Sequence, residues 1–466
     1  MGAKMRDNVF LNHEKVKIIK DDVLLTNEIP KESVDLIVTS PPYNVDIKYN
    51  SHKLFSKIKE DKTWAFRDSS RKDTSYASHS YHRYPAKFIP QLARRCILEN
   101  SEEGDLVVDP FCGCGTTIVE SLIYGRKSIG TDINPVAILI SKAKISPIEP
   151  EKLIKEKEKL FSLIEDKKEI EDKKFNERII YWFPDKKIRL ELLSILNNIY
   201  SLKDENLKNF FLCGFSQILK NCSIWLSKSN KPTRDFNKKP QEPIKAFKRQ
   251  INSMIKKNLE LYNLTRGKLI KEKRIILSDA RKIPAKDNSV KMIVTSPPYV
   301  TSYEYADLHQ LTALWLEYTN NLNEFREGFI GSTHKQDINH NGIKSQLALK
   351  TIDDLYKKSK KEALGTKNYF LEMQQCFQEM YRILSTGGRA CIVIGNTRLR
   401  GVDILNAEIF VEIMNNLGFK TYKIIKRAVP SKILPQTRDS KTGRFAKTEN
   451  ADRLAYNYEF ILIMKK

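Results

Sequence analysis

Two segments of the 466-residue chain contain the same five residues, Thr-Ser-Pro-Pro-Tyr, each after an apolar run typical of a buried strand. They are DLIVTSPPYNVDIKY, from Asp35 to Tyr49, and MIVTSPPYVTSYEY, from Met292 to Tyr305. A serine hydroxyl and a carbonyl that proline fixes in place can accept hydrogen bonds, while tyrosine supplies an aromatic face. Each copy therefore has the groups needed to hold a flat ring by its amine hydrogens.

A second chemically distinctive segment is GDLVVDPFCGCGTT. Its apolar strand ends at Asp109, a tight loop with Gly113 and Gly115 follows, and a helix is expected to begin at Thr116. The spacing is DPFxGxG rather than the GxGxxG of dinucleotide sites. An acid at such a loop repels a pyrophosphate but accepts hydrogen bonds from an ammonium group. The segment therefore favours a nucleoside that carries an amino acid, such as S-adenosylmethionine.

A further acid follows at the end of the next strand. In KSIGTDINP, Asp132 comes about 20 positions after the glycine loop, a spacing at which an acid can hold ribose hydroxyls. Ligands of open α/β sheets bind at the carboxyl ends of the strands, where this residue is expected. A third segment, HRYPAKFIPQLARRCI, precedes the loop, and its prolines also suit the start of a helix.

The order of predicted elements indicates an α/β protein in three parts. Strands alternate with helical patterns at both ends of the chain, which predicts a mainly parallel sheet covered by helices. Between them, apolar residues at three- and four-residue spacing predict a helical insertion. We place the parts at 1–148, 149–268 and 269–466. Two basic stretches of the last part, 331–367 and 431–450, are predicted as surface loops near a ligand.

Composition narrows the class of protein. Hydrophobic residues make up 41% and charged residues 30%, and no apolar run of about 18 residues or signal pattern is present, which predicts a cytoplasmic protein outside the membrane. The seven cysteines are scattered, so neither a metal site nor a disulfide framework is expected. The net charge of +24 suits a polyanionic partner, and it equally suits a Lys-rich composition without one.

Together the segments TSPPY, DPFCGCGTT, GTDINP and HRYPAKF resemble the amino-methyltransferases of DNA, which methylate exocyclic nitrogens of cytosine or adenine. The resemblance covers most of the chain apart from parts of the insertion and the basic stretches. It implies a Rossmann-like class I methyltransferase fold with a seven-stranded, mostly parallel sheet and helices on both faces. It also implies S-adenosylmethionine as cofactor and double-stranded DNA as substrate. SPPY in place of DPPY points to N4 of cytosine, and the implied context is a restriction-modification system with a cognate endonuclease.

The family pattern implies a role for each matching residue. Asp132 is expected at the ribose hydroxyls and Asp279 near the adenine. The residues implied to bind the cofactor are His82, Pro85, Lys87, Phe88, Asp109, Phe111, Gly113, Gly115, Thr116, Asp132 and Asp279. Those implied to hold the target base are Ser296, Pro297, Pro298 and Tyr299, or their counterparts Ser40, Pro41, Pro42 and Tyr43.

The amine chemistry explains why such a motif is needed. An exocyclic amine gives its lone pair to the ring and is a poor nucleophile. If the serine hydroxyl and the carbonyl of the first proline accept its two hydrogens, the nitrogen moves toward tetrahedral geometry and the lone pair can face a methyl group. The base must leave the duplex stack to reach this position, and the tyrosine supplies a surface for it.

The number and order of the predicted strands favour one of the two Thr-Ser-Pro-Pro-Tyr copies as catalytic. From HRYPAKF onward, the chain supplies a complete set of sheet strands in which Met292–Tyr299 takes the catalytic place. Only residues 50–81 separate the N-terminal copy from His82, too few for the strands of a second domain. We therefore predict Ser296–Tyr299 as catalytic, and a permuted arrangement that uses Ser40–Tyr43 is the alternative.

The helical insertion 149–268 and the two basic stretches are candidates for target recognition, and residues of 331–367 are predicted to read base edges. Arg438, Lys441, Arg444 and Lys447 are predicted to meet phosphates, with a solvated charged surface as the alternative. Three other functions fit the sequence: methylation of adenine N6 in DNA, methylation of base amines in structured RNA, and a non-catalytic DNA-binding subunit.

Overall fold

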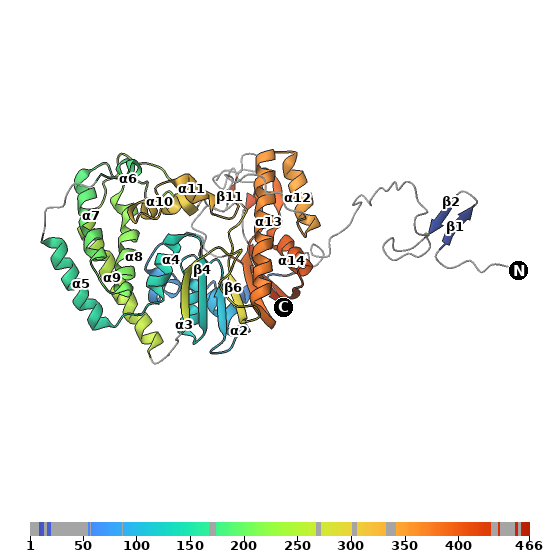
Figure 1. Cartoon of the computed structure of the whole chain (residues 1–466), viewed down its shortest axis with the longest axis horizontal. Coiled ribbons are helices and arrows are strands. Elements are labelled where there is room, and N and C mark those ends of the chain that lie inside the picture. The colour runs from blue at the N-terminus through green and yellow to red at the C-terminus, as the bar shows by residue number, and fades with distance from the viewer. Residues whose placement is uncertain are drawn as a thin grey trace. The chain divides into compact units, whose positions relative to one another are not determined.

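The computed structural model describes residues 9–13, 16–19, 55, 57–85, 87–166, 174–266, 272–300, 305–331, 342–429, 437–438, 453–454 and 458–466 (Figure 1). By its contacts the chain divides into two units, Met1–Tyr49 and Asn50–Lys466. In the first unit, β1 (Val9–His13) pairs antiparallel with β2 (Val16–Ile19). The N-terminal Thr-Ser-Pro-Pro-Tyr copy, with Ser40, Pro41, Pro42 and Tyr43, lies outside the described residues.

A seven-stranded sheet forms the centre of the second unit, in the order β10–β13–β7–β6–β3–β4–β5. Its pairs are parallel except for those of β13, which runs antiparallel to both of its neighbours. This order confirms the predicted Rossmann-like class I methyltransferase fold. The strands are β3 (Leu106–Asp109), β4 (Lys127–Asp132), β5 (Lys273–Leu277), β6 (Val290–Thr295), β7 (Leu384–Ile394), β10 (Lys420–Ala428) and β13 (Tyr458–Lys465).

The order of the strands reverses direction between β3 and β6. The chain runs from β3 to β4 and then β5 along one half of the sheet, and it returns to place β6 on the other side of β3. Open α/β sheets bind their ligands in the crevice at such a switch point. The residues that follow β3 and β6 are the glycine loop and Ser296, so the fold brings the two predicted halves of the site together.

Helices cover both faces of the sheet. Leu92 and Ile97 of α2 (Pro90–Asn100) share one core cluster with Val107, Met292 and Val393 of the strands. The other helices and short strands of the α/β part are α3 (Thr116–Ile123), α4 (Pro135–Lys144), α10 (Tyr305–Trp315), α11 (Leu322–Glu327), α12 (Gln346–Tyr356), α13 (Lys360–Ile383), α14 (Asn406–Asn416), β8 (Thr397–Leu399), β9 (Val402–Ile404), β11 (Thr437–Arg438) and β12 (Arg453–Leu454). Three 3₁₀ turns, η1 (Lys62–Trp64), η2 (Asp73–Ser75) and η3 (Ala77–Ser80), precede α2.

The chain between α4 and β5 forms a bundle of helices, which lies beside α4 at one side of the sheet (Figure 1). It comprises α5 (Pro150–Glu165), α6 (Glu177–Trp182), α7 (Lys186–Tyr200), α8 (Glu205–Cys222) and α9 (Pro243–Thr265). Its interior is rich in buried aromatic rings, among them Trp182, Phe210 and Phe247. Asp185 and Asp204 accept backbone N–H bonds at the starts of α7 and α8, which satisfies donors that a helix leaves free. Helix α8 of the bundle packs on α4, which in turn packs on β4 and β5.

The prediction of a loop over residues 331–367 is wrong for most of the part that the structure describes. Residues 346–356 form α12, and α13 begins at Lys360. The physical reason is an amphipathic pattern hidden among lysines, because Leu347, Thr351 and Leu355 recur at four-residue spacing and are buried.

In the described part of the chain, no helix has both the length and the apolar character required to cross a membrane. Among the described residues, no three His, Cys, Asp or Glu side chains gather closely enough to hold a metal ion. The seven cysteines are buried and unpaired.

Candidate functional site

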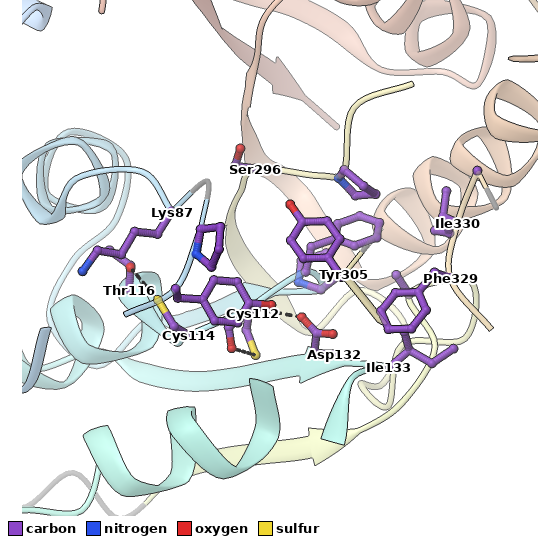
Figure 2. A pocket seen from close by; sticks show the side chains of 18 of the residues that line it. Lys87, Cys112, Cys114, Thr116, Asp132, Ile133, Ser296, Tyr305, Phe329 and Ile330 are labelled. Atoms are coloured by element: carbon purple, nitrogen blue, oxygen red, sulfur yellow. Dashed lines mark hydrogen bonds between the residues drawn. The ribbon is translucent and has the colours of Figure 1, made fainter. Parts of the chain in front are cut away.

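A cavity opens at the carboxyl ends of β3, β4 and β6, at the switch point of the sheet (Figure 2). Lys87 lies toward one end of it and Phe329 toward the other, with Asp132 between them. The predicted residues that line the cavity are Pro85, Lys87, Phe88, Phe111, Gly113, Thr116, Asp132, Asp279, Ser296 and Pro298. The structure therefore brings together residues that are far apart in the chain, from Pro85 to Pro298. A site at a switch point is built in this way, from the ends of several strands.

The glycine loop is shaped by hydrogen bonds to the two strand-end acids. Asp109 accepts the Thr295 hydroxyl at 2.6 Å and the backbone N–H of Phe111 at 3.1 Å. Asp132 accepts the backbone N–H of Gly113 at 2.8 Å. Asp109 is buried behind the loop and does not line the cavity, whereas Asp132 does. Asp109 thus holds the loop against β6, and Asp132 is the strand-end acid that lines the cavity.

Burial shifts both acids toward neutrality. It raises the pKa of Asp109 to about 6, against hydrogen bonds from Thr295 and the Phe111 N–H that favour the charged form. Burial also raises the pKa of Asp132 to about 6, against the backbone bonds from Asn134 and Gly113. A carboxyl group with such a pKa changes charge just below neutral pH.

Gly115, the N-cap residue of α3, has a left-handed backbone conformation and no room for a side chain. Its φ is +76°, and a Cβ atom would lie 2.9 Å from the Ser141 hydroxyl oxygen. Gly104 has a similar φ of +85° but open space around it.

We expect Gly115→Ala to lower the free energy of unfolding by about 2–4 kcal/mol, the sum of left-handed strain and a forced contact. Gly104→Ala is the control and should cost only the strain, about 1–2 kcal/mol. Urea unfolding of both variants measures the difference. Equal losses would show that the Ser141 contact is without consequence.

The HRYPAKF segment divides between the cavity and the bundle. Pro85, Lys87 and Phe88 line the cavity, and the Lys87 ammonium donates to the His79 carbonyl at 2.9 Å. His82 instead lies at the bundle, where its Nε2 is 2.9 Å from the Ser216 hydroxyl. Burial lowers the pKa of His82 to about 3, so its ring is neutral. His82 therefore connects the HRYPAKF segment to α8 by a hydrogen bond.

Asp279 reaches the cavity with its carboxylate already paired. Arg281 donates from Nε to Asp279 at 2.9 Å and from Nη1 to Glu372 of α13 at 2.8 Å. The other oxygen of Glu372 accepts the backbone N–H of Gly331 at 2.9 Å. Glu372 therefore fixes two parts of the cavity wall. Its role could not be predicted from the sequence, because its partners Gly331 and Arg281 are 41 and 91 positions away in the chain.

The Ser-Pro-Pro-Tyr loop is held from two sides. The Ser296 hydroxyl donates to the Val393 carbonyl of β7 at 3.1 Å. Tyr369 of α13 donates its hydroxyl to the Pro298 carbonyl at 2.7 Å. Ser296 and Pro298 line the cavity, while Pro297 is buried. Because the serine hydrogen is used by Val393, the oxygen lone pairs remain as acceptors.

Tyr299 lies beside the residue that follows β7. Its ring is close to Gly395, where an added Cβ would lie 3.3 Å from the Tyr299 Cε2 atom. Tyr299 does not line the cavity, and neither does Gly115. The structure thus places the Tyr299 ring next to the cavity rather than in it.

Aromatic residues of the wall were also missed from the sequence. Tyr84 and Tyr305 line the cavity and stack on each other with ring centroids 6.3 Å apart. Phe329 and Ile330 of the segment after α11 complete the wall. Tyr84 sits inside HRYPAKF, so its position in the motif was a usable signal, whereas the segment after α11 carries no such pattern.

The predicted DNA contacts fall largely outside the described residues. Arg438 belongs to β11, which pairs antiparallel with β12. Lys441, Arg444 and Lys447 lie outside the described part of the chain.

Comparisons with known proteins match this geometry to one family. The family model described as DNA methylase, of the N6 and N4 type, matches residues 56–143 and 290–466, more than half of the chain. The match includes the glycine loop, Asp132 and the Ser296 copy, and it leaves out residues 1–55 with the N-terminal copy.

Two relatives match over nearly their whole length. The Type II methyltransferase M.MvaI of Kocuria varians is 27% identical, over 89% of this chain and 96% of its own. The Type II methyltransferase M.BsoBI of Geobacillus stearothermophilus is 23% identical, over 83% and 90%. Among solved structures, a putative DNA modification methylase from Thermus thermophilus with bound S-adenosylmethionine is 21% identical over 41% of this chain and 53% of its own, with a TM-score of 0.20.

The residues of the cavity also fit the cofactor of this family. A Cβ at Gly113 would lie 3.2 Å from Tyr84, so the absence of a side chain keeps the space between loop and ring open. An acid, Asp132, stands where ribose hydroxyls could donate, beside the aromatic wall. The chain belongs to the DNA methylase family of N6 and N4 amino-methyltransferases, enzymes that depend on S-adenosylmethionine.

Proposed function

We propose that the protein methylates N4 of cytosine within a specific sequence of double-stranded DNA. The observation that carries this proposal is Ser296, which lines the cavity at the end of β6 with its hydrogen engaged by Val393 and its lone pairs free to accept an amine hydrogen. A neutral serine at this position, in place of the aspartate of DPPY, is the family feature that favours cytosine. The two long relatives are named Type II methyltransferases, which supports the role of modification enzyme beside a cognate endonuclease.

The mechanism assigns one task to each side of the loop. Ser296 and the Pro297 carbonyl accept the two amine hydrogens, so the lone pair of the nitrogen turns away from the ring. Tyr299 offers its face to the base that has left the stack. Asp132, Asp279 and the aromatic wall orient the cofactor, which when bound supplies an electrophilic methyl group. Orientation of two reactants contributes up to about 7–11 kcal/mol in well-aligned systems.

The copy at Ser296–Tyr299 is proposed as catalytic. It follows β6, the neighbour of the glycine-loop strand, and it falls within the family match, whereas the Ser40–Tyr43 copy does not.

The test is long-read sequencing of DNA from a methylation-free bacterial host that expresses the protein, beside hosts with Tyr299→Ala and Tyr43→Ala. We expect sequence-specific N4-methylcytosine that is lost with Tyr299→Ala and kept with Tyr43→Ala. Loss with Tyr43→Ala alone would move catalysis to the N-terminal copy, and a methyladenine signal would overturn the choice of cytosine. If the DNA is unmodified and the RNA of the same host is methylated, the substrate is RNA rather than DNA.

The raised pKa of Asp132 predicts how cofactor binding depends on pH. The ribose hydroxyls need an ionised acceptor, so the Kd of S-adenosylmethionine should rise about tenfold per pH unit as the pH falls below about 6. Above that value it should be flat. Calorimetry from pH 5 to 8 measures this, and Asp132→Asn should flatten the curve. An unchanged Kd across the range would show that Asp132 does not bind the cofactor as an anion.

Tyr369 is proposed to position the loop. Because Tyr369→Phe removes one hydrogen bond, worth about 1 kcal/mol, kcat should fall about fivefold with the cofactor Kd unchanged. Tyr381→Phe is the control, since this tyrosine is on the same helix but packs on Phe419. Single-turnover methylation assays of both variants decide. A loss in cofactor affinity instead would indicate a general disturbance of the cavity.

A further inference from the structure

An exposed aromatic and basic surface lies on the helical bundle. Arg234 stacks between two rings, with its Cζ atom 3.8 Å from the ring centroid of Tyr181 and 4.8 Å from that of Phe236. Phe236 is 75% exposed, the largest value among the exposed large hydrophobic residues of the described chain. Tyr181 is also exposed, so the two rings and the guanidinium form one exposed group on this surface.

The segment that carries these residues is fixed rather than loose. The Leu226 N–H donates to the Thr233 carbonyl and the Asp235 N–H donates to the Ile224 carbonyl, both at 2.8 Å. The Lys238 ammonium donates to the carbonyls of Lys220 and Trp225, each at 2.7 Å. These bonds hold residues 226–239 against the end of α8, so Phe236 is presented to solvent by an ordered backbone.

The charge of the same segment favours an anionic partner. Residues 226–239 carry five basic residues and one acid, Asp235. The basic residues are Lys228, Lys231, Arg234, Lys238 and Lys239. Basic side chains interleaved with an exposed aromatic ring are typical of surfaces that bind nucleic acid, where cations meet phosphates and the ring meets a sugar or base.

A chain of contacts connects this surface to the cavity. Trp225 stacks on Trp182 of α6 with ring centroids 4.8 Å apart, and the Trp182 indole N–H donates to Gln310 of α10 at 2.9 Å. Helix α10 begins at Tyr305, which lines the cavity, and α6 and α10 lie side by side (Figure 1). Gln310 is about 7.5 Å along the helix from Tyr305, at 1.5 Å per residue. Residues 226–239 are therefore joined to the cavity wall through Trp225, Trp182 and α10.

We infer that residues 226–239 bind the DNA duplex beside the target base, with Arg234 and the exposed lysines Lys228, Lys231 and Lys239 at phosphates and Phe236 against the sugar edge. This inference rests on the proposed function, because it takes duplex DNA as the substrate. It adds a second anchoring point on the bundle, separate from the Ser-Pro-Pro-Tyr loop. Binding at two places fixes the register of the duplex while the base leaves the stack.

The test uses a fluorescein-labelled duplex of random sequence and fluorescence anisotropy with the full-length chain. We expect Phe236→Ala to raise the Kd about tenfold, the range found for loss of an aromatic contact to a nucleotide. Arg234→Ala should weaken binding and reduce the slope of log K against log salt by about one, whereas Arg234→Lys should keep the slope. The Kd of S-adenosylmethionine should stay the same in all three variants.

A matched control comes from the opposite end of the sheet. Tyr422 is 54% exposed and also holds an arginine, Arg389, whose Cζ is 4.1 Å from the ring centroid. It lies near the start of β10, at the amino-terminal edge. Tyr422→Ala should leave the Kd for DNA within about twofold of the wild type, since counterion effects of a remote surface residue are small.

The outcomes separate the inference from the function. Equal Kd values for wild type, Phe236→Ala and Arg234→Ala, or an equal loss in Tyr422→Ala, would overturn the inference and leave the proposed function standing. A wild-type protein that neither binds nor methylates duplex DNA would overturn the proposed function. A loss in Phe236→Ala seen with hairpin RNA but not with duplex would also reject duplex as the partner of this surface.

Discussion

Replacing Ser296 by alanine should lower kcat for methyl transfer by about 100-fold, the usual loss when one preorganised hydrogen-bond partner of the transition state is removed. Ser296 lines the cavity and its hydroxyl is fixed by its bond to the Val393 carbonyl, and in our proposal the oxygen lone pairs accept the amine hydrogen. In the alanine variant the amine keeps its conjugation with the ring. The Kd of S-adenosylmethionine should change little, because in our assignment this side chain serves the base.

Ser385 provides the matched control for this experiment. Its hydroxyl donates to the Val290 carbonyl at 3.2 Å, so it joins the same two strands at their other end. Ser385→Ala should keep kcat within about twofold while it loses a similar bond, worth about 1 kcal/mol of stability. Single-turnover rates with saturating cofactor measure both variants. Equal rates for the two would remove Ser296 from the mechanism.

Asp132→Ala should raise the Kd of S-adenosylmethionine by about 100-fold or more. The carboxylate holds the Gly113 N–H at 2.8 Å and, in our proposal, the ribose hydroxyls. Bonds to a charged group contribute about 1.5–3 kcal/mol each, and the loop also loses its anchor. With cofactor at high concentration, kcat should recover in part, which separates a binding role from a role in the chemical step.

Asp105→Ala is the control for Asp132. Asp105 lies just before β3 and its carboxylate accepts the Glu102 N–H at 2.8 Å, so it makes the same kind of bond away from the cavity. We expect the cofactor Kd of this variant to equal that of the wild type in calorimetry. If Asp132→Ala also binds normally, the acid serves only the shape of the loop.

The parts of the site that could be predicted are those encoded by neighbouring residues. The acid and glycines of DPFCGCGTT follow an apolar run directly, so strand, loop and helix could be read together. The same holds for the apolar run before Ser296. Asp132 was identifiable because its spacing from the loop reflects one helix and one strand of ordinary length.

The parts that could not be predicted depend on contacts between distant segments. Tyr369 and Glu372 occur in a helix whose sequence shows only an amphipathic pattern, and their partners are 71 and 91 positions away. The pairing of Asp279 with Arg281 was close in sequence, but its third member, Glu372, was not. Helix α12 was hidden because it buries only four residues, Leu347, Ala348, Thr351 and Leu355, within a stretch rich in lysine.

Helix α13 carries Tyr369 and Glu372 three residues apart, hence on one face, with the first bonded to the Pro298 carbonyl and the second to Arg281 and Gly331. One rigid element therefore supports both the loop assigned to the base and the wall assigned to the adenine. We expect a shift of this helix to change both affinities together, which would link the two ligands thermodynamically. By reciprocity, any factor by which cofactor tightens DNA binding is the factor by which DNA tightens cofactor binding, and α13 is the element that sets its size.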